Sequence, residues 1–143
     1  MPNEYIMNVG TCALRKLITC SANDSVAKVA RMLRDTGERN IIVLDKEKPI
    51  GVISVMDIAY RLVAEDKDAS DTPAKAIMTK EIMIKNASDS LTPTYIDMIK
   101  SNKYGCVIMD NNRVKGMLDL KEAMNCIVKL KAPQKNGNNN KNR

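Results

Sequence analysis

Ser54 and Asp57 are the residues whose types and spacing could bind a ligand. They follow an apolar run in the stretch GVISVMDI, residues 51–58, where a strand would end and a helix would begin. The start of a helix offers unpaired backbone N–H groups and the positive end of the helix dipole, both of which attract a phosphate. The Ser54 hydroxyl would add a donor, and the Asp57 carboxylate could accept hydrogen bonds from both hydroxyls of a ribose. The spacing is therefore compatible with a nucleotide site.

The same pair also fits a purely structural role. A serine followed three residues later by an acidic residue can form a capping box, in which each side chain accepts a hydrogen bond from a backbone N–H of the helix start. Such caps are far commoner than nucleotide sites, so the pair alone does not decide between the two roles. Gly51 likewise has a structural interpretation, because a glycine in a strand allows another segment to pack closely.

The rest of the sequence offers no arrangement typical of catalysis. The chain has no histidine, and no nucleophile stands beside an obvious base. Three aspartates between residues 66 and 71 lack the glycine spacing of a calcium loop, so we expect a solvated loop there. The four cysteines form no C-x-x-C pair, and we expect free thiols in the core rather than a zinc or disulfide site: Cys12, Cys20, Cys106 and Cys126. We therefore expect a protein without catalytic activity, metal or covalent cofactor.

Length and composition indicate one globular domain or two small ones that share a core, with 143 residues of which 44% are hydrophobic and 28% charged. The chain lacks a signal peptide pattern and a run of about 18 apolar residues, so we expect a cytoplasmic protein with no membrane span. Five of its six excess positive charges lie in residues 129–143. We predict a basic disordered tail at residues 131–143, for which a solubilising role is favoured over nucleic-acid binding.

The chain contains two copies of one unit. Residues 22–63 align with residues 87–128 at a constant shift of 65 positions. Each copy begins with a helix cap, NDS or SDS, and continues with a helical pattern, two short apolar runs around a polar turn, and a second helical pattern. One such helix-strand-strand-helix unit is too small to bury its apolar faces alone. We therefore expect the two units to pack on each other.

The motifs of both copies resemble those of CBS domains, the modules named after cystathionine β-synthase. The resemblance extends over about residues 9–130 and rests on three segments, RNIIVLDKEKPIGVISVMDIAYRLV, PAKAIMTKEI and YGCVIMDNNRVKGMLDLKEAM. It implies an α/β fold in which two β-α-β-β-α modules associate through their sheets around a pseudo-two-fold axis. We place the modules at residues 9–66 and 77–130, with a linker at residues 67–76. The resemblance also implies a homodimer in the form of a flat disc of four modules.

The resemblance further implies an adenosyl ligand in a cleft between the modules, such as AMP, ADP, ATP or S-adenosylmethionine. The role would be regulatory, exerted on an unidentified protein partner. The family's ribose and phosphate signature is a glycine, an apolar residue, any residue, a serine or threonine and, three residues later, an aspartate. Residues 51–57 match it. The resulting site residues, which include an adenine slot on the second module and a basic group for phosphates, are Gly51, Val52, Ser54, Asp57, Ile82, Met83, Lys103, Tyr104 and Arg39, with Lys80 and Arg61 as weaker candidates.

The second copy keeps the cap but changes its chemistry. Asp119 and Glu122 occupy the positions that align with Ser54 and Asp57. Two like charges about 4 Å apart repel by roughly 4 kcal/mol at an effective dielectric near 20, so we expect the cleft at Asp119 to reject phosphorylated ligands. It would hold a neutral or cationic adenosyl compound, or be empty.

Two functions stay open at this point. The first is a sensor of adenosyl compounds. The alternative is a dimeric interaction or nucleic-acid-binding scaffold without a small-molecule ligand, in which the capping box is only a cap and the basic tail binds the partner.

Overall fold

The computed structural model describes residues 7–103 and 105–131 of the chain, and contains two similar halves. The elements of the first half are β1 (Thr19–Ser21), α1 (Val26–Thr36), β2 (Asn40–Asp45), β3 (Lys48–Ser54), α2 (Val55–Asp57) and the π-helix η2 (Ile58–Val63) that continues α2. The elements of the second half are β4 (Ile84–Asn86), α4 (Leu91–Lys100), β5 (Gly105–Asp110), β6 (Arg113–Asp119) and α5 (Leu120–Lys131). A short helix precedes each half, η1 (Val9–Thr11) and α3 (Ala74–Ile77).

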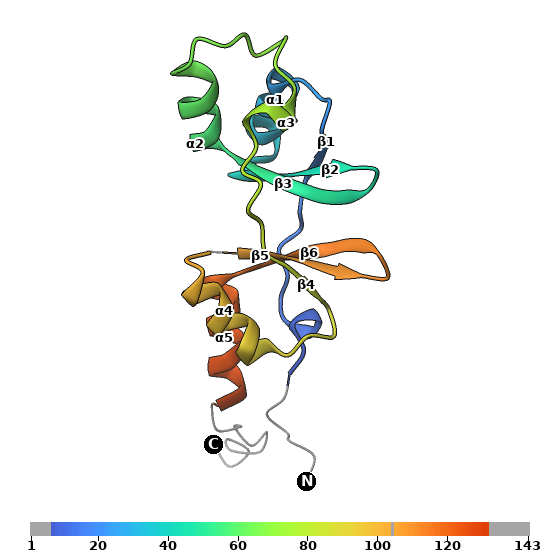
Figure 1. Ribbon diagram of the computed structural model, residues 1–143. Helices are drawn as coiled ribbons and strands as arrows, with labels where there is room; N and C mark the ends of the chain where they lie inside the picture. Colours follow the sequence, from blue (N-terminus) through green and yellow to red (C-terminus); the bar gives the residue numbers. More distant parts are fainter. Residues whose placement is uncertain (1–6, 104, 132–143) are drawn as a thin grey trace, which may run out of the picture.

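Each half follows the order β-α-β-β-α that the family resemblance predicts. In the first sheet β1 pairs parallel with β2, which pairs antiparallel with β3, and β4, β5 and β6 repeat this arrangement. Figure 1 shows the two sheets facing each other, with the helices on their outer sides. The predicted α/β fold of two modules is confirmed.

The repeat extends to the hairpin turns. Lys46 and Glu47 have φ values of 50° and 68°, and the aligned Asn111 and Asn112 have φ values of 52° and 63°. Two consecutive residues with positive φ match the twist of paired strands, and asparagine adopts this conformation more easily than lysine or glutamate. The first copy therefore makes the turn without favourable residue types, which indicates that strand pairing imposes the turn.

The caps of the first helix of each copy differ in their bonds. Ser25, the predicted cap of α1, accepts a hydrogen bond from the Lys28 N–H at 3.1 Å. Gly37 closes the same helix with a φ of 72°, and its N–H donates to the Leu33 carbonyl at 2.9 Å. Ser90 occupies the cap position of α4 without a side-chain hydrogen bond to the helix. Both cap signals thus lie where the sequence predicted a helix start.

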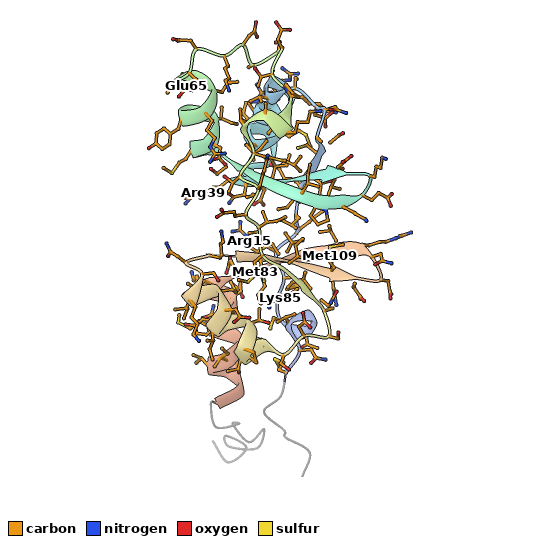
Figure 2. The ribbon with its side chains drawn as sticks, in the orientation of Figure 1. Arg15, Arg39, Glu65, Met83, Lys85 and Met109 are labelled. Atoms are coloured by element: carbon orange, nitrogen blue, oxygen red, sulfur yellow. The ribbon has the colours of Figure 1, made fainter. Side chains whose placement is uncertain are left out.

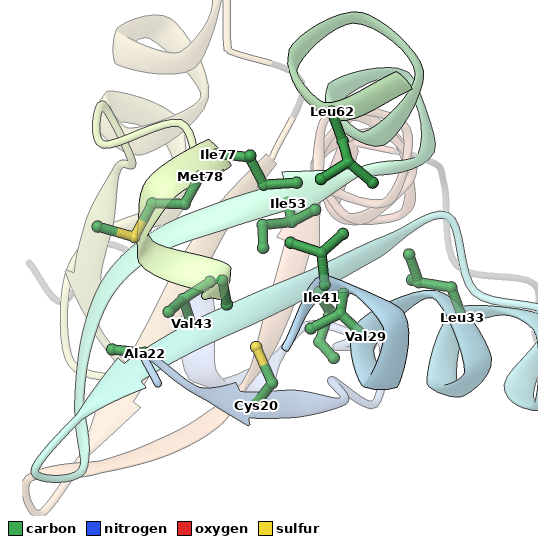
Figure 3. Close-up of a cluster of buried hydrophobic side chains, with 12 residues drawn as sticks. Cys20, Ala22, Val29, Leu33, Ile41, Val43, Ile53, Leu62, Ile77 and Met78 are labelled. Atoms are coloured by element: carbon green, nitrogen blue, oxygen red, sulfur yellow. The ribbon is translucent and has the colours of Figure 1, made fainter. Parts of the chain in front are cut away.

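Each module has its own apolar core on the outer side of its sheet. In the first core, side chains of α1 pack against those of β2 and β3, and α3 adds Ala74 and Ile77 (Figure 3). The second core repeats this with α4, β5, β6 and α5. The largest fully buried side chains of the two cores include Ile41, Ile53, Ile77, Leu91, Met98, Ile108 and Leu118.

Two segments pack across the module boundaries that the sequence suggested. Val9 and Cys12, at the start of the first predicted module, are buried in the second core. Ala74 lies in the predicted linker and Ile77 at the start of the second predicted module, yet both are buried in the first core. The chain therefore crosses between the modules twice, once on entering the first and once on leaving it. As a division of the sequence, the boundaries 9–66, 67–76 and 77–130 stay a prediction.

Gly51 and its aligned counterpart Gly116 allow these crossing segments to pack closely on the sheets. Thr79 forms an antiparallel bridge with Val52, with N–O distances of 2.8 and 3.0 Å, and Arg15 bridges Met117 in the same way. A Cβ atom on Gly51 would lie 2.6 Å from the Met78 sulfur and 2.9 Å from the Thr79 carbonyl oxygen. One on Gly116 would lie 2.9 Å from the Arg15 carbonyl oxygen. The structural interpretation of Gly51 therefore accounts for a glycine in both copies.

Replacement of either glycine by alanine should destabilise the fold. We expect Gly51→Ala and Gly116→Ala each to lower the free energy of unfolding by about 1–3 kcal/mol, because the new methyl group meets backbone that cannot move aside. Urea unfolding followed by circular dichroism measures the change. The exposed Lys67→Ala serves as the control and should stay within about 0.5 kcal/mol of the wild type. Unchanged midpoints in both glycine variants would contradict the close packing.

Candidate functional site

A cavity of about 220 Å³ lies between the two modules. Its walls come from β2, β3 and α2 of the first module, from β5 and β6 of the second, and from the segments that precede β4 and β5. The residues that line it are Asn40, Ile42, Val52, Ser54, Asp57, Thr79, Glu81, Ile82, Met83, Asn102, Lys103, Gly105, Cys106, Val107 and Met117. We call this space the first cavity.

Six of the nine predicted site residues line the first cavity, namely Val52, Ser54, Asp57, Ile82, Met83 and Lys103. Gly51 lies beside it, against Met78 and Thr79. Arg39 lines a different cavity together with Arg15, and Figure 2 labels both residues. The prediction for Tyr104 falls outside the described residues. Neither Lys80 nor Arg61 is among the described residues that line the first cavity. Arg61 nevertheless contacts a lining residue, because its Nε lies 3.7 Å from the Asp57 Oδ1.

Ser54 and Asp57 form the capping box that their spacing predicts. Ser54 is extended, with φ −102° and ψ 164°, and it closes β3 directly before α2. The Asp57 N–H donates to the Ser54 Oγ at 3.1 Å, and the Ser54 N–H donates to the Asp57 Oδ2 at 2.9 Å. Both side chains are thus cap and cavity wall at once, so the two roles do not exclude each other.

Part of the anion-binding capacity of this helix start is already used. The Val55 N–H donates to the Arg39 carbonyl at 3.2 Å, and the Asp57 N–H donates to Ser54. A phosphate would have to compete for these donors. The helix start is therefore a weaker phosphate site than the sequence pattern suggests.

The second oxygen of Asp57 is held more loosely than the first. Its Oδ1 lies 3.4 Å from the Thr79 hydroxyl and 3.7 Å from the Arg61 Nε. Arg61 also donates to the Ile77 and Met78 carbonyls at 3.3 and 2.9 Å. The Asp57 side chain is 15% exposed. Asp57 Oδ1 is thus positioned by an arginine that is anchored on the crossing segment, and it retains capacity to accept hydrogen bonds.

The charged groups that line the first cavity do not favour an anion. Asp57 and Glu81 carry negative charge, and Lys103 is the one cation among the described lining residues. The Lys103 Nζ donates to the Glu81 carbonyl at 3.0 Å and lies 3.8 Å from a Glu81 carboxylate oxygen. The lining therefore has a formal charge of −1, and its cation is already occupied.

Cys106 is the one thiol on the described wall of the first cavity. Burial raises its pKa to about 11, so the thiol stays protonated at neutral pH. A protonated thiol is a poor nucleophile. Cys106 therefore contributes an apolar surface rather than reactivity.

Sequence reasoning missed several lining residues that the repeat itself could have indicated. Three pairs of aligned positions face the first cavity from opposite modules, and they are Asn40 with Gly105, Ile42 with Val107, and Val52 with Met117. Because the sheets face each other, a position that faces the cavity in one copy does so in the other. Thr79, Glu81 and Asn102 come from connecting segments, where no such signal exists.

A second cavity of about 480 Å³ lies at the aligned helix start of the second module. It is lined by Arg15, Arg39, Asn40, Tyr95, Asp119, Leu120, Lys121 and Met124. The Asp119 Oδ1 accepts a hydrogen bond from the Glu122 N–H at 2.7 Å, which confirms the predicted cap, and the Oδ2 lies 3.7 Å from an Arg15 nitrogen. Three basic side chains against one carboxylate give this lining a formal charge of +2. The structure thus argues against the expected rejection of phosphates, because sequence reasoning counted Asp119 without its basic neighbours.

Comparisons with known proteins agree with this architecture. Residues 9–64 match the family model described as the CBS domain. The structure superposes on the CBS domain pair of protein MJ0100, solved in complex with 5′-methylthioadenosine and S-adenosyl-L-methionine, with a TM-score of 0.69 and 23% identity over 87% of this chain and 98% of that one. The chain has the fold of a tandem CBS-domain pair. The first module provides the signature residues of the first cavity, and the second provides the facing wall.

Two further matches are to proteins that are longer than this chain. A hexameric CBS-CP12 protein from bloom-forming cyanobacteria matches with a TM-score of 0.71 and 14% identity, over 94% of this chain and 79% of that one. Uncharacterized protein MK0525 of Methanopyrus kandleri is 22% identical over 82% of this chain, which spans 61% of that relative's length. Within residues 7–103 and 105–131, no helix has the length and apolar character needed to cross a bilayer.

The capping role of Ser54 can be measured apart from any ligand. We expect Ser54→Ala to lower the free energy of unfolding by about 1 kcal/mol, because alanine cannot accept the hydrogen bond from the Asp57 N–H. Ser54→Asn is the matched variant, since asparagine is an equally good cap, and it should retain the stability of the wild type. Urea unfolding in ligand-free buffer compares the two. Equal stability of the alanine and asparagine variants would show that the cap contributes nothing.

Proposed function

We propose that this chain is a regulatory module that binds an adenosyl compound in the first cavity and transmits its occupancy to a protein partner. One observation carries the proposal. Ser54 and Asp57 of the first module converge with Ile82, Met83 and Lys103 of the second on one cavity. A ligand there would contact both modules, so its affinity would depend on their relative arrangement. Such a dependence is what a ligand needs to shift a protein between two states.

The walls of the cavity suit the parts of a nucleoside. Asp57 Oδ1 would accept hydrogen bonds from ribose hydroxyls, because its other oxygen is committed to the Ser54 N–H. The adenine ring would lie among the apolar side chains of Ile42, Val107 and Met117, which are all buried in the structure without a ligand. An apolar slot with a few placed polar groups is typical of a small-molecule site.

The charge of the lining favours some adenosyl compounds over others. A formal charge of −1, with Lys103 engaged by Glu81, would repel the phosphates of AMP, ADP and ATP. A neutral thioether nucleoside or a cationic sulfonium would meet no such repulsion. We therefore rank methylthioadenosine and S-adenosylmethionine above the nucleotides as ligands of the first cavity. The solved complex of the MJ0100 pair with the same two compounds supports this order.

A thermal-shift panel tests the ligand. AMP, ADP, ATP, S-adenosylmethionine and methylthioadenosine are each added to the full chain. At a concentration of about 100 times its dissociation constant, a true ligand should raise the free energy of unfolding by roughly 2.7 kcal/mol. Asp57→Ala should abolish the ligand-induced shift, whereas Glu122→Ala, the aligned position of the second copy, should leave the shift from a first-cavity ligand unchanged.

A second variant separates ligand binding from capping, because Asp57→Ala also removes the bond to Ser54. Ile82→Trp should fill the cavity and abolish the shift while leaving the capping box intact. A ligand-induced shift that survives both Asp57→Ala and Ile82→Trp would rule out this site. The absence of a shift with every compound would overturn the sensor proposal and favour a scaffold without a small-molecule ligand.

We also propose that two copies of the chain associate through the last helix of each module. Val63 and Val128 occupy aligned positions on η2 and α5, and their exposed fractions are 65% and 58%. Met56 on α2, Tyr60 on η2 and Met124 on α5 are exposed as well. Exposed apolar side chains that recur at one position of a repeat suggest a surface that a symmetric partner covers. The proposed arrangement is the homodimer of four modules that the family resemblance implies.

Light scattering coupled to size-exclusion chromatography tests the association. We expect the wild type to elute with the mass of a dimer and Val63→Asp combined with Val128→Asp to elute as a folded monomer, because each aspartate would bury an unpaired charge in the interface. Lys67→Asp, an exposed polar position near the end of the same helix, is the control and should remain dimeric. A monomeric wild type at micromolar concentration would contradict the proposal.

A further inference from the structure

Cys12 and Cys126 bring two thiols into direct contact inside the second module. Cys12 follows η1 in the N-terminal segment, and Cys126 lies on α5, 114 residues further along the chain. Their sulfur atoms are 2.6 Å apart. Cys12 is buried and Cys126 is half-buried. Neither residue lines the two cavities described above, so nothing in the proposed ligand site accounts for this contact.

The distance suits a covalent bond better than a shared metal ion. A disulfide requires a sulfur separation of about 2.05 Å, which is about 0.6 Å shorter than the present distance. Two thiolates that bind one zinc ion at about 2.3 Å each would lie about 3.8 Å apart in tetrahedral geometry. The third sulfur nearby belongs to Met7, whose Sδ accepts the Cys126 S–H at 3.2 Å. A thioether adds no charge that would hold a cation, so the cluster lacks the usual features of a zinc site.

We propose that Cys12 and Cys126 form a reversible disulfide when the protein meets a small-molecule disulfide such as oxidised glutathione. Cys126, the more accessible thiol, loses its proton and attacks one sulfur of the oxidant, and one glutathione leaves as a thiolate. Cys12 then loses its proton and attacks the Cys126 sulfur of this mixed disulfide, which releases the second glutathione. The two protons pass to the two glutathione thiolates. The two electrons that the protein thiols lose reduce the oxidised glutathione to two molecules of reduced glutathione. The product is one new sulfur–sulfur bond in the protein.

The surroundings of Cys12 explain why the disulfide would form only slowly at neutral pH. Burial, followed by the contact with Cys126 and the nearby charge of Glu122, raises the pKa of Cys12 to about 12. Only a small fraction of Cys12 is therefore a thiolate at neutral pH, and the closing step is slow there. The fraction of thiolate, and with it the rate of closure, increases as the pH rises toward 12. The bond would thus form under sustained oxidation rather than in brief exposure.

The bond would fix the N-terminal segment to the second module. That segment is held at present by backbone hydrogen bonds, from the Val9 N–H to the Asp89 carbonyl and from the Gly10 N–H to the Ala87 carbonyl, both 2.9 Å. It also carries Arg15, which pairs with Met117 on β6 and lines the second cavity. A disulfide between Cys12 and α5 would close a ring that includes both modules. Such a ring restricts the unfolded chain and so stabilises the fold.

Oxidation of the full chain tests the proposal. Reduced wild-type protein is incubated with oxidised glutathione, remaining thiols are alkylated under native and then denaturing conditions, and the products are mapped by peptide mass spectrometry. We expect loss of two hydrogen atoms, a cross-linked pair of peptides that contain Cys12 and Cys126, faster closure at higher pH, and a higher melting temperature that dithiothreitol reverses.

Matched variants assign the effect to this pair. Cys20→Ala combined with Cys106→Ala keeps the two partners and should oxidise like the wild type. Cys126→Ser, at the half-buried position, should form no intramolecular cross-link and gain no thermal stability from the oxidant. The proposal is overturned if all four wild-type thiols remain open to alkylation after oxidation, or if the cross-link joins any other pair.

Discussion

The structure depends on the contact between the inner faces of the two sheets. Each module covers the outer face of its sheet with its own helices, which bury Ile41, Val43 and Ile53 in the first copy. The alternate side chain, Ile42, points the other way and is still only 1% exposed. On this inner face it lines the first cavity, whose facing walls are connecting segments and strands of the second module. The run of apolar residues in β2 without polar alternation follows from this double burial, since a strand covered on both faces has no solvent side.

The sequence predicted the repeated architecture well because the signals that carry it are local. Caps, helical spacing and paired apolar runs recur at a fixed shift of 65 residues, and the structure places an element at each of them. The exchange of the crossing segments could not be predicted in this way. Val9 and Ile77 are apolar residues in short segments. The residues next to them in the sequence do not indicate which of the two similar cores they enter. Gly51 and Gly116 gave an indirect indication of this exchange, because a glycine at these two positions leaves room for a crossing segment on the sheet.

The candidate site was predictable in part for the same reason. Ser54 and Asp57 belong to a short pattern with a definite spacing, and they line the first cavity while forming the cap. Arg39 and Asp119 were judged from their positions alone, whereas their electrostatic effect depends on neighbours that are distant in the sequence. Arg15 lies over a hundred residues before Asp119, yet its guanidinium lies 3.7 Å from that carboxylate. Charge in a site between two modules is therefore a property of the fold more than of the motif.

Asn40 belongs to the walls of both cavities. Its side chain has one carbonyl oxygen and one amide group, and it cannot direct the same atom into two spaces at once. A molecule that orients this amide from one side therefore fixes what the other side offers, and by thermodynamic linkage the influence is mutual. If both cavities bind a ligand, Asn40 would make the two occupancies interdependent, because it is a wall of each.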